Sequence, residues 1–169
     1  MNKALHSLLL NDMKKLYDVE HQLAAALPKM AKMATSPDLK EGFAMHAKQT
    51  EKQILKLERA FKHLKATPRR SKSPSMAALI LEGMKTAQSI GDKQARDAAL
   101  IGAADQVEHA EMGAYESAWL LAQSMDHNET ADILEEIREE EHHTSKLLNK
   151  TGKKLTKMSM MQMARGMMS

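Results

Sequence analysis

Apolar residues recur at alternating intervals of three and four along four long stretches of this chain, at about 3–34, 37–65, 93–125 and 129–150. This is the period of an amphipathic α-helix. The second stretch shows it most clearly, through Phe43, Ala47, Thr50, Ile54, Leu57, Phe61 and Leu64. The pattern predicts four helices that each turn one face toward a shared core.

Proline and glycine mark where these helices are expected to end. Pro28 lies inside the first apolar pattern and predicts a kink or an early end to that helix. Gly91 is expected to end a short helix at about 76–90. Gly152 is likewise expected to end the fourth long helix.

The connections predict how the helices pack. Short turns join the first helix to the second and the third to the fourth, so each pair is expected to form an antiparallel hairpin. Residues 66–75 and the short helix form one long crossover between the hairpins, as in ferritin-like bundles. The chain is therefore predicted to be an all-α, ferritin-like four-helix bundle over 1–150, with an extra helix in the crossover. A basic, Met-rich tail over 151–169 is expected to be mobile or docked.

The composition favours a helical domain and excludes cysteine chemistry. The 169 residues include seven Gly, four Pro and no Cys. Disulfides, iron–sulfur clusters, thiolate zinc sites and cysteine nucleophiles are therefore excluded. The first residues lack the apolar segment of a signal peptide, and no apolar run approaches the roughly 20 residues that span a bilayer. We expect a soluble, cytoplasmic protein with no membrane association.

Charge is unevenly distributed around a net value of +3. The loop at 62–72 and the tail from Lys150 are basic, while residues 129–141 are acidic. Solvated surface is the simpler interpretation of the basic segments, because no groove-reading motif or stacking aromatic accompanies them. Any nucleic-acid binding is expected to be non-specific. The methionines between Met158 and Met168 suit either Cu(I) or a flexible apolar contact.

Each long helix carries a carboxylate at or next to an otherwise apolar position. A buried carboxylate is costly unless it is paired or coordinates a metal. Four helices that each point one inward have the arrangement of a dinuclear metal site in a bundle. The candidates are Glu20 in the first helix, Glu51 in the second, Glu108 and Glu111 in the third, and Glu140 and Glu141 in the fourth.

The fourth helix offers two ways to choose its ligand. Residues 139–143 (EEEHH) contain the Glu-x-x-His spacing of di-iron carboxylate bundles twice. The apolar seam of the helix instead points Glu141 inward. We expect Glu141 to be the ligand, Glu140 to lie beside the site, and His142 and His143 to be exposed.

The second helix has weaker candidates. Glu51 is one residue away from the seam position Thr50, and His46 is either a ligand or a histidine at the bundle edge. Tyr17 and Tyr115 are expected near the same level, where a buried phenol needs a hydrogen-bond partner. Oxygen ligands with some imidazole suit iron or manganese better than copper.

Three segments carry a resemblance to a known family. They are LYDVEHQLAAALPKMAKMA (16–34), DAALIGAADQVEHAEMGAYESAWLLAQSM (97–125) and ILEEIREEEHH (133–143). The chain resembles the YciE/YciF family of ferritin-like bacterial stress proteins over nearly all of residues 4–150. The resemblance implies a rubrerythrin-like bundle, usually a homodimer, with a dinuclear metal site. It implies no particular reaction, because the activity of the family is not established.

The second helix departs from the pattern of that family. The family usually has His, two residues, then Glu-Thr-x-x-Gln, whereas this chain has Gln49 in place of the glutamate. A neutral amide binds a hard cation more weakly than a carboxylate. Either Glu51 or His46 compensates, or metal affinity is reduced.

Two functions follow from these patterns. The first is a stress-response protein whose dinuclear iron or manganese site acts on O₂ or peroxide. The alternative is a non-enzymatic, structural stress protein whose metal site is degraded or vacant. The sequence assigns no catalytic residue in either case.

Overall fold

The structure, a computed structural model, describes the backbone of residues 2–166, with side chains for 2–155 and at Lys157. Within these residues every regular element is an α-helix. They are α1 (Lys3–Met33), α2 (Pro37–His63), α3 (Pro74–Ser89), α4 (Lys93–Ser124) and α5 (Asn128–Gly166). The predicted all-α fold is confirmed, and no helix in the described part of the chain is both long and apolar enough to cross a membrane.

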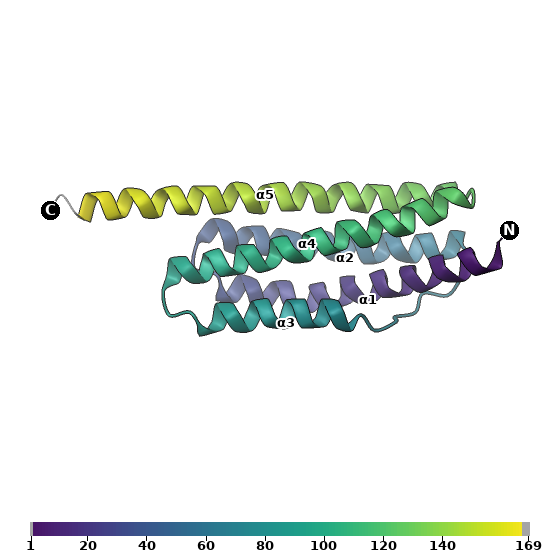
Figure 1. The fold of residues 1–169 in the computed structure, drawn as a ribbon, viewed down its shortest axis with the longest axis horizontal. Helices are drawn as coiled ribbons and strands as arrows, with labels where there is room; N and C mark the ends of the chain where they lie inside the picture. Colours follow the sequence, from purple (N-terminus) through teal and green to yellow (C-terminus); the bar gives the residue numbers. More distant parts are fainter. Residues whose placement is uncertain (1, 167–169) are drawn as a thin grey trace.

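The long helices α1, α2, α4 and α5 lie side by side, and the short helix α3 lies along one edge of them (Figure 1). Helix α1 packs against α2, and α4 packs against α5, as expected for two hairpins. Contacts of α2 with α5 and of α1 with α4 close the bundle. Helix α3 lies in the crossover and packs on α4 and α1. The ferritin-like bundle with an extra crossover helix is therefore confirmed.

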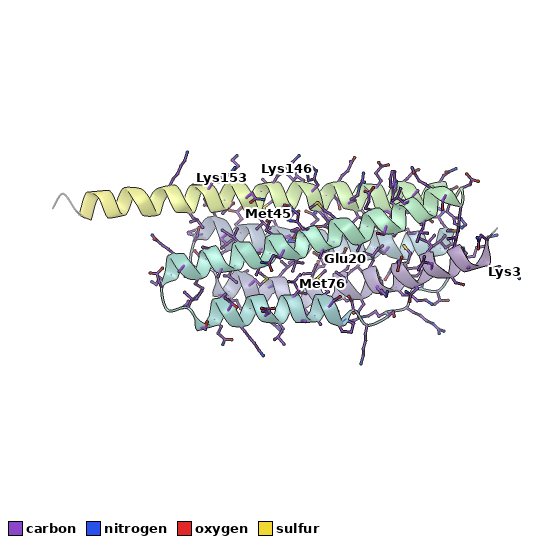
Figure 2. The ribbon with its side chains drawn as sticks, in the orientation of Figure 1. Lys3, Glu20, Met45, Met76, Lys146 and Lys153 are labelled. Atoms are coloured by element: carbon purple, nitrogen blue, oxygen red, sulfur yellow. The ribbon has the colours of Figure 1, made fainter. Side chains whose placement is uncertain are left out.

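The core of the bundle is divided into two apolar clusters. Helix α2 shows the division, because Phe61 belongs to one cluster and Phe43 to the other. Between them α2 buries three polar side chains, His46, Thr50 and Gln53. Glu20 of α1 lies at the same level, inside the bundle and away from both of its ends (Figure 2). A polar layer therefore crosses the middle of the core.

Two buried aspartates tie the connections to the helices. Asp97 of α4 accepts hydrogen bonds from the backbone N–H groups of Thr35 and Ser36, both at 2.7 Å, and so holds the α1–α2 turn. Asp18 of α1 accepts from the backbone N–H of Ser73 at 2.9 Å, which holds the end of the crossover. These charge-assisted bonds fix the register of the helices around the polar layer.

The structure tests two predicted helix ends. Helix α1 spans Lys3–Met33, close to the predicted 3–34, and it continues through Pro28, so the early end offered as an alternative to a kink does not occur. Helix α5 passes through Gly152 and continues to Gly166, so the prediction that Gly152 ends it is wrong. A single glycine costs a helix only about 1 kcal/mol, and Leu155 beyond it packs on an apolar cluster. Side chains of the methionine-rich segment lie outside the described residues, and the division at 150 stays a prediction.

A matched pair of Gly→Ala substitutions tests these helix assignments. Gly152→Ala should stabilise the protein by about 0.5–1 kcal/mol, because the position is helical and a Cβ would lie 3.5 Å from Ile101 Cγ2, an ordinary contact. Gly83→Ala should destabilise it by about 1–3 kcal/mol, because a Cβ there would overlap Ala103 Cβ of α4. Urea unfolding would measure both. A destabilising Gly152→Ala would mean that α5 ends near that residue.

Candidate metal centre

Five buried side chains form two overlapping groups of ligands in the polar layer. One group contains His46, Glu108 and Glu141, and the other contains Glu20, Glu111 and Glu141. Within each group one ligand atom from every residue lies within 4.8 Å of the others. Helices α1, α2, α4 and α5 all contribute, and the Glu141 carboxylate is common to both groups. Two ligand groups that share a carboxylate are a candidate arrangement for two cations.

Helical periodicity explains why these residues meet. Glu108 and Glu111 are three apart and share one face of α4. Glu141 follows the buried Ile137 of α5 by four residues, and Glu20 follows the buried Leu16 of α1 by four. Apolar side chains on the same stripe therefore carry each carboxylate into the core.

Hydrogen bonds orient some of the ligand atoms. The Tyr115 hydroxyl, itself buried, donates to the Glu20 carboxylate, and the Gln53 amide donates to Glu141. The His46 ring lies between two carboxylates, with Nδ1 3.4 Å from Glu108 Oε1 and Nε2 3.6 Å from Glu141 Oε2. Partners of this kind fix the direction of metal-binding side chains.

Many ligand atoms are nevertheless left without a hydrogen-bond partner among the described residues. They are Glu20 Oε2, Glu108 Oε2, both oxygens of Glu111, Glu141 Oε2 and His46 Nε2. A buried polar atom without a partner costs about 1–3 kcal/mol. Carboxylate oxygens with an imidazole nitrogen are suitable donors for iron or manganese. The residues present therefore fit a pair of such cations.

Burial changes the proton affinity of the centre. Desolvation raises the pKa of Glu20, Glu108 and Glu111 well above the usual value of 4.5, and the Glu141 charge raises each pKa further. Burial also opposes ionisation of Glu141, but the adjoining His46, Glu108 and Gln53 side chains outweigh it and lower its pKa. Without a cation, protons therefore neutralise most of the carboxylates, and metal binding must release them.

Two sequence candidates lie away from the centre. Glu51 is exposed and belongs to neither group, because it is one residue further around α2 than the buried Thr50. The hydroxyl of Tyr17 donates to Glu58 at 2.8 Å and makes no hydrogen bond with the ligands in the described part of the chain. Of the two proposed compensations for Gln49, the structure therefore brings only His46 to the centre.

Two other candidates lie at its edge. Gln49 is half-buried and donates to the Thr144 hydroxyl at 3.4 Å. Glu140 pairs with Lys56 at 2.5 Å and accepts a hydrogen bond from Gln53 at 3.2 Å. Gln53 thus donates to both Glu140 and Glu141 of α5. Glu140 therefore lies beside the ligand residues, where the sequence analysis expects it.

Sequence reasoning missed the role of Gln53. The apolar pattern favoured Ala47 and Ile54 as inward positions, but both are only partly buried, while His46 and Gln53 are buried. Their spacing of seven residues was the available signal, because it keeps two side chains on one face of a helix. His142 and His143 are exposed, as expected.

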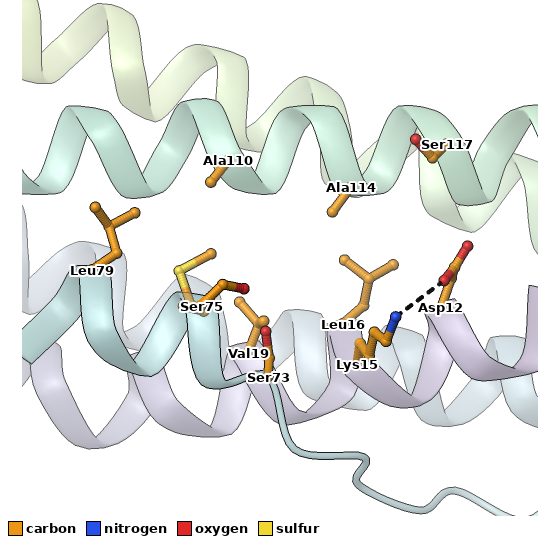
Figure 3. A pocket seen from close by; sticks show the side chains of 11 residues that line it. Asp12, Lys15, Leu16, Val19, Ser73, Ser75, Leu79, Ala110, Ala114 and Ser117 are labelled. Carbon is orange, nitrogen blue, oxygen red and sulfur yellow. Dashed lines mark ion pairs between the residues drawn. The ribbon is translucent and has the colours of Figure 1, made fainter.

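The pocket that is lined by ligand residues of this centre is small. An apolar pocket of about 10 Å³ adjoins His46 and Glu108, and its other walls include Leu23 and Val107. That volume is close to what one water molecule requires. A larger pocket of about 370 Å³ opens between α1, the start of α3 and α4, and none of the five ligand residues lines it (Figure 3).

Comparisons with known proteins agree with this fold. Residues 4–161 match the family described as a domain of unknown function, DUF892. Protein YciF of Escherichia coli K12 is 32% identical over 145 residues, which are 84% of this chain and 86% of YciF.

Solved structures extend the comparison. The E. coli stress protein YciF matches with a TM-score of 0.87 at 28% identity, over 90% of this chain and 97% of YciF. YcfI of Rhodopseudomonas palustris matches with a TM-score of 0.84 at 35% identity, over 86% and 92% of the two chains. A protein of Xanthomonas campestris shares the fold, with a TM-score of 0.74 at 19% identity over 95% and 99%.

The raised pKa values predict how stability depends on pH. Above pH 4.5 the folded, metal-free protein retains protons on Glu20, Glu108 and Glu111 that the unfolded chain has lost. Its free energy of unfolding should therefore fall as pH rises from about 4.5 through the raised pKa values. Added Mn²⁺ should reduce this fall, because the cation replaces the protons. Chemical unfolding with and without metal tests this, and the Glu111→Gln variant should show a shallower pH dependence. Metal-free stability that rises over this range would contradict the analysis.

Proposed function

The chain belongs to the DUF892 family, and from this premise we propose that it is a stress-response protein with a dinuclear iron or manganese site that acts on O₂ or peroxide. The observation that carries the proposal is the pair of buried ligand groups that share Glu141. The description of YciF as a stress protein supports the cellular role. A homodimeric state and a cytoplasmic location belong to the same proposal and are supported by the family resemblance.

Each ligand group would hold one ion. His46 and Glu108 would bind the first, Glu20 and Glu111 the second, and Glu141 would bind both. Iron or manganese bound there would supply a Lewis acid and a redox centre for a small oxidant. The Tyr115 hydroxyl would keep Glu20 oriented, and the Gln53 amide would do the same for Glu141.

The surroundings of the centre favour a small reactant. Apolar clusters lie on both sides of the polar layer and keep bulk water away from it. The pocket next to His46 and Glu108 has room for a molecule about the size of water. O₂ and peroxide are closer to this limit than any organic substrate.

One observation favours a second candidate, a structural stress protein whose site is vacant. Within the described residues α2 contributes no carboxylate to either ligand group, because Gln49 and Gln53 are amides and Glu51 is exposed. Weaker metal binding would leave the carboxylates protonated. The protein would then be a stable bundle with no redox chemistry.

Iron loading and one substitution distinguish these functions. Protein loaded with Fe²⁺ should contain about two iron ions per chain and change its absorption spectrum on titration with peroxide. Glu111→Leu should reduce iron content and remove the metal-dependent part of thermal stability. Glu51→Leu is the control, since Glu51 is exposed, and should match the original chain. A metal content well below one per chain, with Glu111→Leu as stable as or more stable than the original, would support the vacant site.

A gain-of-function variant tests whether the amide on α2 limits affinity. Gln49→Glu adds a carboxylate at the edge of the centre, 3.4 Å from Thr144 in the present side-chain position. Mn²⁺ affinity should rise on the order of tenfold, the scale of changes around metal ligands. Gln123→Glu, at an exposed position of α4, controls for the added negative charge. Equal affinities in these two variants would show that residue 49 does not influence the ions.

A further inference from the structure

Two histidines face one another at an end of the bundle, away from the carboxylate layer. His6 lies near the start of α1, and His127 lies in the turn between α4 and α5. Nδ1 of His6 is 3.3 Å from Nε2 of His127, although the two residues are 121 positions apart in the sequence. Both side chains are partly buried. Neither residue belongs to the central ligand groups.

The backbone on both sides of this pair is fixed. Asn2 caps α1 through its side chain, and its carbonyl accepts the N–H of His6 at 3.0 Å. On the other side, the N–H of His127 donates to the carbonyl of Ala122 at 3.0 Å, and Asp126 adopts a left-handed conformation with φ of 59°. The closeness of the two rings is therefore built into a helix cap and a tight turn.

The rings meet at their edges. Their planes are inclined by 53° and their centroids are 5.4 Å apart, which excludes face-to-face stacking. Two nitrogens that each lie about 2.05 Å from one tetrahedral ion are separated by about 3.3 Å. The observed separation equals this value, and it also allows a direct hydrogen bond between the two rings when no metal is bound.

We propose that His6 and His127 together bind one divalent transition-metal ion of the class that prefers imidazole, such as Zn²⁺, with water at its remaining positions. The donor set differs from that of the central layer, which consists of four carboxylates and one imidazole. A bound ion would join the first turn of α1 to the start of α5. This site is independent of the function proposed for the carboxylate centre.

Zinc titration of the full chain tests the proposal. Protein freed of metal with a chelator is titrated with Zn²⁺ by calorimetry, and its thermal unfolding is measured with and without the metal. His6→Ala and His127→Ala should each bind one equivalent of Zn²⁺ less than the original chain and lose part of the zinc-dependent rise in Tm. Whatever Zn²⁺ the central carboxylates bind is the same in all of these proteins.

The exposed histidines of α5 provide the control. His142 and His143 are adjacent on the helix, so their side chains point in different directions, and the double variant His142→Ala/His143→Ala should keep the full zinc stoichiometry. If an alanine variant fails to fold, His6→Gln removes the ligand and retains a polar side chain. Zinc stoichiometry unchanged by substitution of His6 and of His127 would overturn the site and leave a hydrogen-bonded imidazole pair. An equal loss of bound Zn²⁺ in the His142→Ala/His143→Ala variant would also overturn the proposed site.

Discussion

The constraint on which this structure depends is the burial of four carboxylates in one layer of a helical core. Removing an ionised carboxylate from water is costly, and four of them at one level are tolerated only if positive charge or protons neutralise them. The raised pKa values of Glu20, Glu108 and Glu111 show that protons can neutralise these carboxylates. Protonation reduces the charge of the layer, yet some oxygens of the same residues still have no hydrogen-bond partner among the described residues, and a bound cation would satisfy them.

The rest of the fold keeps this layer dry and in register. Apolar side chains lie on both sides of the ligands along each helix, as Leu16 and Leu23 do around Glu20. The tethers made by Asp97 and Asp18 act at the two connections of the chain that precede and follow α2. Asp97 holds the turn before α2, and Asp18 holds the end of the crossover where α3 begins, so the start of α2 is fixed relative to α4. His46 and Gln53 of α2 lie at the level of the carboxylates from α4 and α5.

Much of this arrangement could be predicted from the sequence, and the failures have a common cause. Glu20, Glu111 and Glu141 occupy positions that an apolar pattern already defines, so helical periodicity placed them. On α2 the inward positions next to the carboxylates are polar, and the apolar pattern followed the partly buried Ala47 and Ile54 instead. Hydropathy could not identify His46 and Gln53 as inward residues, because they are polar and are buried against the carboxylates of the other helices. Tertiary packing likewise decided the course of α5, since Leu155 continues to contact the core beyond a glycine that local propensity treats as an end.

The neutral amide at position 49 is consistent with the charge of the centre. Glu20, Glu108, Glu111 and Glu141 carry four negative charges when ionised, which equals the charge of two divalent cations. The charge of Glu140 at the edge is already offset by Lys56. A glutamate in place of Gln49, as in the family pattern, would add a fifth negative charge and favour a more oxidised pair. In the proposed metal centre the amide would therefore match two divalent ions, and the departure on α2 would influence their oxidation state as well as their affinity.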